Sequence, residues 1–415
     1  MLTSSRTRRI LIIVSSMAIG GPQKSLIGLL ERIDTKSLAV DLMLLNGLPG
    51  ALSPSLPPHV RVLHTPPEVA AATLPRNDFA RSLRVLLFAV RLRTLPALMW
   101  ELVKGVLRRD GWQTVRQRVW RAVRADLPRL PEHYEAAFGI LGLSTYAVVD
   151  LVDAEFKYHW IRSDTRMLQR DEEIDAEYYR QLTGAVSVSA QCSDIFQEMY
   201  PSTHGRVVVY KNDIPLRLRS GGAEELPEFS RMASHMLLTV SRLDRLKGID
   251  LAIRACAELV ARGHRVCWVV AGEGPEREKL EQLVQRHDLA EFFLLPGSIL
   301  DMGPYLEVAD VYVHPSRAEG RSNAVEEARA QGLPIVATAY ETVAGQVEDG
   351  VTGIVCEIDS GGIADAIERV LVDPGLRVRL GEAAKRAYAS EVCDPNALMN
   401  CLSRGVLPTF VAGAD

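Results

Sequence analysis

Short apolar runs alternate with segments of helical period along most of the chain. In the amino-terminal half, apolar runs of strand length lie near residues 10–14, 40–45, 60–63, 137–141, 185–188 and 206–209. In the carboxyl-terminal half we expect strands over 236–240, 266–271, 292–295, 311–314 and 334–337. Helices are expected between these strands, over 248–262, 275–287 and 323–331. Such alternation predicts parallel sheets covered by helices on both faces, and hence an α/β protein.

One polar stretch interrupts this alternation. Residues 216–233 contain glycine and proline, have no apolar period and are interpreted as an interdomain linker. We therefore assign a first domain to 1–215 and a second to 234–385, followed by carboxyl-terminal helices over 386–415. Ligands of parallel-sheet domains bind beyond the carboxyl ends of the strands, so two such domains are expected to face a central cleft.

A basic insertion stands out within the first domain. Residues 76–130 hold thirteen arginine or lysine residues against four acidic ones, a net charge of +9 in a chain whose total is −4. Apolar residues are interleaved with these arginines over a helical stretch from about 78 to 126. We expect this stretch to lie on an anionic membrane surface, or alternatively to pack on its own domain with a solvated basic face.

Composition narrows the class and the compartment. The chain is 47% hydrophobic and 24% charged, as in globular proteins, and its overall acidic balance argues against a nucleic-acid-binding role. Six cysteines without a C-x-x-C pair indicate neither a zinc site nor a disulfide framework, and fit a reducing cytoplasm. Three arginines before the apolar run imitate a signal peptide, but the glycine loop and amphipathic helix that follow favour a buried first strand over 10–14.

The residues most suggestive of chemistry follow the strand expected at 311–314. Asn323 is expected to cap the next helix, with Glu326 three positions on completing a capping box. Glu319 then lies in the loop and Glu327 in the first turns of the helix. Carboxylates there can accept hydrogen bonds from sugar hydroxyls, while free amides meet phosphate oxygens. The plainer alternative is that acidic residues only complement the helix dipole.

A second loop carries positive charge. Residues 241–248 read Ser-Arg-Leu-Asp-Arg-Leu-Lys-Gly and lie between an expected strand and an expected helix. Arg242 and Lys247 can both reach a diphosphate from such a loop, although a solvated basic loop is the alternative.

Taken together, the motifs of residues 236–356 resemble those of the retaining glycosyltransferases of family 4, which have the GT-B fold of two Rossmann-like domains. The resemblance rests on an ordered series of motifs: Val240-Ser241-Arg242-Leu243, Lys247-Gly248, Ala271-Gly272-Glu273-Gly274-Pro275, Pro296-Gly297, Ala309-Asp310-Val311, Pro315-Ser316, Glu319-Gly320 with Glu327, Gly332-Leu333-Pro334 through Thr338, and Glu348-Asp349-Gly350-Val351-Thr352-Gly353. It leaves open whether 386–415 packs back on the first domain, as in that family.

The resemblance implies a role for each matched residue. Arg242 and Lys247 would bind the donor diphosphate, Glu319 the donor sugar and Glu327 the ribose of the nucleotide. Gly20-Gly21 resembles the glycine loop that lies beside the transferred sugar and the acceptor. The further substrate-binding residues that it implies are Ser298, Ile299, Gly320, Ser322, Asn323, Thr342 and Val343.

Two departures from the family pattern bear on the mechanism. Arg162 stands where a histidine is expected near the reacting centre; arginine can hold a phosphate but cannot change its charge near neutral pH. Residues 340–343 replace a Gly-Gly turn, and Gly345 falls where many members have glutamate. Amides at Thr342 and Val343 would still be available to phosphates, whereas sugar recognition there is in doubt.

The resulting hypothesis is a retaining, metal-independent transferase without a cofactor. It would move a sugar from a nucleotide-diphosphate sugar, UDP by family frequency, to a glycan or lipid-linked acceptor in surface polysaccharide or glycolipid synthesis. The alternatives are a UDP-N-acetylglucosamine epimerase of the same fold and a catalytically silent sugar-nucleotide-binding protein. If the chain is an active transferase, replacing Lys247 or Glu319 by alanine should abolish transfer and leave thermal melting nearly unchanged.

Overall fold

The computed structural model describes residues 7–75, 78–108, 110–211, 214, 234–299, 301–391 and 393–408. The linker expected at 216–233 lies outside the described residues, as do Arg76 and Arg109 of the basic insertion. The chain divides into two compact units, one made of Met1–Lys211 with Cys393–Val411 and the other of Asn212–Val392.

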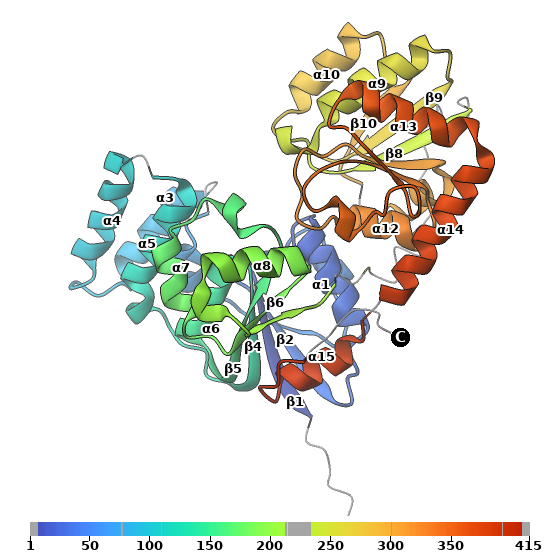
Figure 1. Cartoon of the computed structure of the whole chain (residues 1–415). Helices are drawn as coiled ribbons and strands as arrows, with labels where there is room; N and C mark the ends of the chain where they lie inside the picture. Colours follow the sequence, from blue (N-terminus) through green and yellow to red (C-terminus); the bar gives the residue numbers. More distant parts are fainter. Residues whose placement is uncertain are drawn as a thin grey trace, which may run out of the picture. The chain divides into compact units, whose positions relative to one another are not determined.

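The first unit is built on a seven-stranded parallel sheet in the order β3-β2-β1-β4-β5-β6-β7 (Figure 1). Its strands are β1 (Arg8–Val14), β2 (Leu38–Leu44), β3 (Arg61–Leu63), β4 (His133–Ile140), β5 (Asp153–Ile161), β6 (Gly184–Ser187) and β7 (Val207–Val209). Six of them confirm the apolar runs. Strand β5 escapes that pattern because charged residues interrupt its first half, where it is only partly buried.

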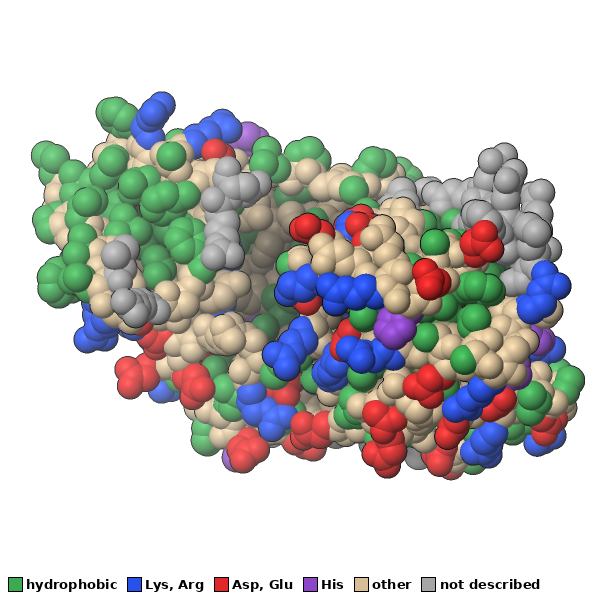
Figure 2. All heavy atoms as spheres, turned by 90° about the horizontal axis from the view of Figure 1, so that it is seen from above, with side chains coloured by type: hydrophobic (Ala, Val, Ile, Leu, Met, Phe, Trp, Pro, Cys, Tyr) green, Lys and Arg blue, Asp and Glu red, His purple; other side chains and the backbone are tan. Residues whose placement is uncertain are grey.

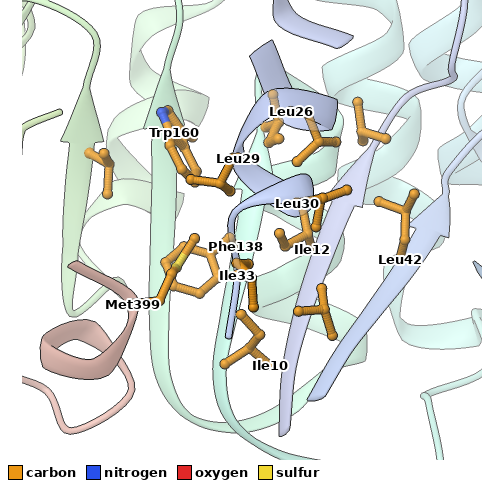
Figure 3. Packing of buried hydrophobic residues seen from close by; sticks show 14 of the residues in the cluster. Ile10, Ile12, Leu26, Leu29, Leu30, Ile33, Leu42, Phe138, Trp160 and Met399 are labelled. Atoms are coloured by element: carbon orange, nitrogen blue, oxygen red, sulfur yellow. The ribbon is translucent and has the colours of Figure 1, made fainter. Parts of the chain in front are cut away.

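Both faces of this sheet are buried, which explains the unbroken apolar run of β1. Ile10 and Ile12 face a core with α1 (Gly21–Glu31) and α15 (Pro395–Leu402), whose Met399 meets Phe138 of the sheet (Figure 3). Leu11 and Ile13 face the opposite core. That side carries α2 (Pro67–Ala72), α5 (Trp112–Val123), α6 (Leu143–Leu151) and α7 (Glu172–Tyr179), with α8 (Ala190–Met199) further along the sheet.

The basic insertion contains three helices instead of one long helix. They are α3 (Phe79–Ala89), α4 (Leu95–Arg108) and α5. The chain leaves the helix at Val90, which has extended backbone angles, and Pro96 occupies the first turn of α4, where its missing N–H costs no hydrogen bond. The second break falls at Gly111, the extended residue before α5.

The second unit has a six-stranded parallel sheet in the order β10-β9-β8-β11-β12-β13. Its strands are β8 (His235–Val240), β9 (Val266–Ala271), β10 (Phe293–Gly297), β11 (Val311–His314), β12 (Ile335–Thr338) and β13 (Ile354–Cys356). Its helices are α9 (Ile249–Ala261), α10 (Arg277–Arg286), α11 (Gly303–Val308), α12 (Asn323–Gln331), α13 (Ser360–Val372) and α14 (Pro374–Glu391). The predicted strands and helices of this region are confirmed, as is the α/β class with two parallel sheets.

The strand order of the second sheet places its candidate loops side by side. Strands β8 and β11 are neighbours, yet the chain between them first builds β9 and β10 on the other side. A ligand crevice forms outside the carboxyl ends of the strands where the order reverses in this way. The loops that follow β8 and β11 are the ones that carry Lys247 and Glu319.

No helix among the described residues is long and apolar enough to cross a membrane.

Candidate active site

The loop after β8 is packed tightly against the loop after β11. It closes with a short helical turn, Arg245–Lys247, in which the Asp244 carboxylate accepts a hydrogen bond from the Leu246 amide at 3.0 Å. Gly248 follows with φ of 64°, and a Cβ there would lie 1.9 Å from the carbonyl oxygen of Pro315. Only glycine permits both that conformation and that approach.

Arg317 fastens the two loops together. Its guanidinium donates to both carboxylate oxygens of Asp250 at 2.7 Å and to the carbonyl of Arg245 at 2.8 Å. Its backbone amide donates to the carbonyl of Leu246 at 2.7 Å. The planar guanidinium thus holds the segment on either side of Lys247 at fixed distances from its own loop.

Lys247 and Glu319 meet at the centre of this arrangement. The Lys247 ammonium lies 2.5 Å from Glu319 Oε2, and both side chains are less than one fifth exposed. His314 Nε2 lies 3.5 Å from the same oxygen, and the Thr342 hydroxyl donates to the Glu319 carbonyl at 2.8 Å. Residues predicted from two separate motifs therefore form one charged cluster.

The electrostatics of the cluster keep Glu319 ionised. Burial alone would raise its pKa, but the hydrogen bond from His314 and the charge of Lys247 outweigh burial and lower the pKa to about 2. Burial lowers the pKa of His314, which favours the neutral imidazole. Removing either member of the Lys247–Glu319 pair would leave a largely buried charge without its partner. The geometry therefore favours a loss of stability in either alanine variant over the nearly unchanged melting expected from the sequence.

The start of α12 differs from the expected capping box. Ser322 is the N-cap, with its hydroxyl accepting from the Val325 amide at 3.4 Å, and Asn323 is the first helical residue. Glu326 does not reach back to the cap, because it is held in a buried ion pair with Arg321 at 2.6 Å and another with Arg329 at 2.8 Å. Charge pairing thus overrides the local capping pattern at this helix.

Gln346 secures the cap from outside the helix. Its side-chain amide oxygen accepts from the Ser322 amide at 2.7 Å, and its nitrogen donates to the Ser322 carbonyl at 2.8 Å. Sequence reasoning missed both Gln346 and Arg317. No local signal exists for either, since their partners lie 24 and 67 residues away in the chain.

The remaining predicted residues of the second unit occupy varied positions. Arg242 is exposed, with 76% of its side chain accessible, and its nearest acidic partner is Asp244 at 3.9 Å. Glu327 is buried on α12. The amide of Val343 donates to the Tyr340 carbonyl at 3.0 Å, so it is already engaged within its turn. Gly320 donates its amide to Glu319 at 3.3 Å; Ser298 is exposed and Ile299 partly buried after β10.

In the first unit, the structure brings Arg162 to the glycine loop. Gly20 is the N-cap of α1 and Gly21 its first residue. Arg162 is buried, donates to the Pro22 carbonyl at 3.1 Å and lies over the ring of Trp160 at 5.6 Å. His159 points into the core, where Thr145 is 2.7 Å from its Nδ1. Burial and the charge of Arg170 lower the pKa of His159 to about 3, which marks a structural histidine.

Known proteins resemble this chain in sequence and in fold. Residues 227–387 match the family model of glycosyl transferases group 1. An alpha-D-kanosaminyltransferase of Streptomyces kanamyceticus is 35% identical over 152 residues, which cover 36% of this chain and 39% of that protein. The lipopolysaccharide core biosynthesis glycosyltransferase LpsE of Rhizobium meliloti is 32% identical over 148 residues, which cover 35% of this chain and 42% of that protein. The matched region thus spans about two fifths of the length of each relative.

Structural similarity extends over almost the whole chain. A crystal structure of Anabaena Alr3699/HepE in complex with UDP matches with a TM-score of 0.64 at 15% identity, covering 94% of this chain and 98% of that one. At this identity the likeness concerns the fold, and it confirms the expected GT-B type of α/β architecture. Among the described residues, no group of three or more His, Cys, Asp or Glu side chains is placed to hold a metal ion.

Proposed function

We propose that this chain is a retaining glycosyltransferase of family 4 that uses a nucleotide-diphosphate sugar, with UDP as the preferred nucleotide. The observation that carries the proposal is the Lys247–Glu319 pair, held at 2.5 Å at the carboxyl ends of two adjacent strands. The match of residues 227–387 to the glycosyl transferase model supports it, as does a structural neighbour crystallised with UDP.

The Lys247–Glu319 pair offers a positive charge to the diphosphate half of the donor and a negative charge to its sugar half. When the donor enters, the Lys247 ammonium and the exposed Arg242 guanidinium bind the diphosphate, and the Glu319 carboxylate accepts hydrogen bonds from sugar hydroxyls. The bond between the sugar carbon and the β-phosphate oxygen breaks with its electron pair on that oxygen. The acceptor hydroxyl attacks from the same face, and its proton passes to the departing phosphate. Fixed positive groups stabilise the charge that develops there, so the proposal requires neither a cofactor nor a metal.

The first unit would supply the acceptor side. The Gly20-Gly21 loop would let a ligand approach the backbone closely, and Arg162 beside it could bind a phosphate group where the family has a histidine. A glycan or lipid-linked acceptor, in surface polysaccharide or glycolipid synthesis at the cytoplasmic face of a membrane, is consistent with the relative named for lipopolysaccharide core biosynthesis.

The proposal is tested by incubating the protein with a panel of UDP-, GDP- and ADP-sugars and following the released sugar by NMR. We expect slow hydrolysis of one donor with retained anomeric configuration, and a loss of about a hundredfold to a thousandfold in Lys247→Ala. Lys279→Ala, which removes an exposed lysine of α10, is the matched control. Release of an altered free sugar without transfer would identify the epimerase, and no turnover of any donor would identify a silent binder.

A further inference from the structure

The outer surface of α3 and α4 is apolar where a soluble helix is ordinarily polar. Met99, Trp100, Val103 and Leu107 form a stripe along the exposed side of α4. Phe88 and Leu92, at the end of α3 and in the following turn, are 86% and 85% exposed. Figure 2 shows hydrophobic side chains gathered over this part of the first unit, with Lys and Arg side chains at the edge.

This exposed stripe is not a displaced core face. The opposite side of α4 already packs inward: Leu98 is fully buried, and Leu95 and Leu102 lie against the same core. Helix α4 is therefore apolar on two sides. Large contiguous exposed apolar patches on a folded surface mark sites that contact a protein partner, a ligand or a membrane.

The charges around the stripe are positive. Residues 78–108 carry six arginine or lysine residues and two acidic ones. Arg81, Arg84, Arg91, Arg93 and Arg108 are exposed. Two basic residues further along the chain are used differently: Arg118 of α5 pairs with Asp110 and Asp171, and Arg124, directly after α5, pairs with Glu177. Some of the described basic residues of the insertion thus form ion pairs within the unit, while others lie exposed beside the apolar stripe.

We infer that the α3–α4 surface, and not the whole insertion, docks on an anionic lipid bilayer, with Phe88, Leu92, Trp100 and Leu107 inserted among the acyl chains. Exposed arginines beside an apolar stripe fit anionic headgroups above a hydrocarbon phase, and tryptophan favours that boundary. A protein partner would instead need acidic groups placed opposite the exposed arginines that surround the apolar stripe. The inference deepens the proposed function, since it places the transferase where a lipid-linked acceptor resides.

The test is co-sedimentation of the full chain with vesicles of phosphatidylcholine alone or with one quarter phosphatidylglycerol. We expect at least tenfold tighter binding to the anionic vesicles. Binding should fall about tenfold or more in Trp100→Ser/Leu107→Ser, and about thirtyfold in Arg84→Gln/Arg93→Gln. Val372→Ser, which removes a similarly exposed residue of the second unit, should bind as the parent does. Brominated acyl chains should quench tryptophan fluorescence in the parent and less in Trp100→Phe.

Several results would overturn the inference: no preference for anionic vesicles, full binding by the Trp100→Ser/Leu107→Ser variant, or a parent dimer that this variant dissociates without any vesicle binding. Donor hydrolysis separates this outcome from the proposed chemistry. The surface variants should hydrolyse soluble donor normally, whereas Lys247→Ala should lose hydrolysis and keep vesicle binding.

Discussion

The two units share one architecture, but one buried charge cluster in each lies at the opposite end of the strands from its counterpart. In the second unit, Lys247 and Glu319 meet beyond the carboxyl ends of β8 and β11. In the first unit, Asp41 is held by Arg9, Arg61 and Tyr134, which are the first or second residues of their strands. The carboxyl end of β1 leads instead into the uncharged Gly20-Gly21 loop. Under the proposed function, the cluster of the second unit binds the donor, whereas the Asp41 cluster of the first unit serves stability.

The largest expected effect concerns the buried cluster of Asp41, Arg9, Arg61 and Tyr134, which we call the stability cluster. Burial alone would raise the pKa of Asp41, but hydrogen bonds from Arg61, Tyr134 and Arg9 hold it below its usual value. Asp41→Asn should lower the free energy of unfolding by about 2 to 4 kcal/mol, because Arg61 and Arg9 lose their common carboxylate. Calorimetry should show a lower melting temperature, while donor hydrolysis per folded molecule stays unchanged.

The control for Asp41 is Asp153→Asn, which breaks an exposed pair with His133 in the same sheet. Surface pairs contribute little, so its melting temperature should barely move. Equal shifts in the two variants would contradict the distinction between a buried cluster and a surface pair.

The next effect concerns the cluster of Lys247 and Glu319, which we call the ligand cluster, and the way its contribution to stability depends on pH. The pKa of Glu319 is about 2 in the folded chain and near 4.5 when unfolded, so its ionised form stabilises the fold above pH 4.5. That contribution is lost as the pH falls from about 4.5 towards 2. Glu319→Gln should therefore be less stable than the parent by up to about 3 kcal/mol at neutral pH, with a gap that narrows in acid.

Chemical denaturation between pH 3 and pH 7 measures this gap. Glu273→Gln is the control, since Glu273 pairs with Arg277 on the surface and its replacement should give almost no gap at any pH. A gap for Glu319→Gln that stays constant with pH would argue that its charge contributes nothing to stability.

The two units also differ in how much of their structure could be predicted from the sequence. In the second unit, strands and helices alternate cleanly, and the site residues lie in short motifs directly after strands, so most elements and the candidates were predicted together. Strand β13 and helix α13 were not predicted. In the first unit, β5 was missed because charged residues interrupt its apolar run, and one helix was predicted where Val90 and Gly111 break the chain.

Long-range contacts explain which features of the candidate site could not be predicted from the sequence. The requirement for glycine at 248 comes from the Pro315 carbonyl, and the position of Glu326 comes from Arg321 and Arg329. A local capping pattern cannot reveal a competing ion pair, so Asn323 was assigned the role that Ser322 performs. Composition, likewise, counts basic residues but does not separate Arg118 and Arg124, which form ion pairs within the unit, from the arginines that lie exposed on and between α3 and α4.

The smallest expected effect concerns the hydrogen bonds between Arg317 and Asp250, the clamp that holds together the two loops carrying Lys247 and Glu319. It tests whether the ligand cluster depends on this clamp. Arg317 is not among the residues proposed to bind the donor; it holds Arg245, Leu246 and Asp250 on both sides of Lys247. Arg317→Ala should lower kcat/KM for donor hydrolysis about tenfold, because Lys247 is held less firmly beside Glu319. Arg317→Lys should restore little, since an ammonium cannot bind both oxygens of Asp250. Asp250→Ala should match Arg317→Ala, and the double variant should be no worse than either, because all three remove one clamp. Arg245→Ala, an exposed change in the same loop, is expected to hydrolyse donor normally. Additive losses in the double variant would mean that Arg317 and Asp250 act separately, and the placement of Lys247 would then have to come from the Gly248 contact alone.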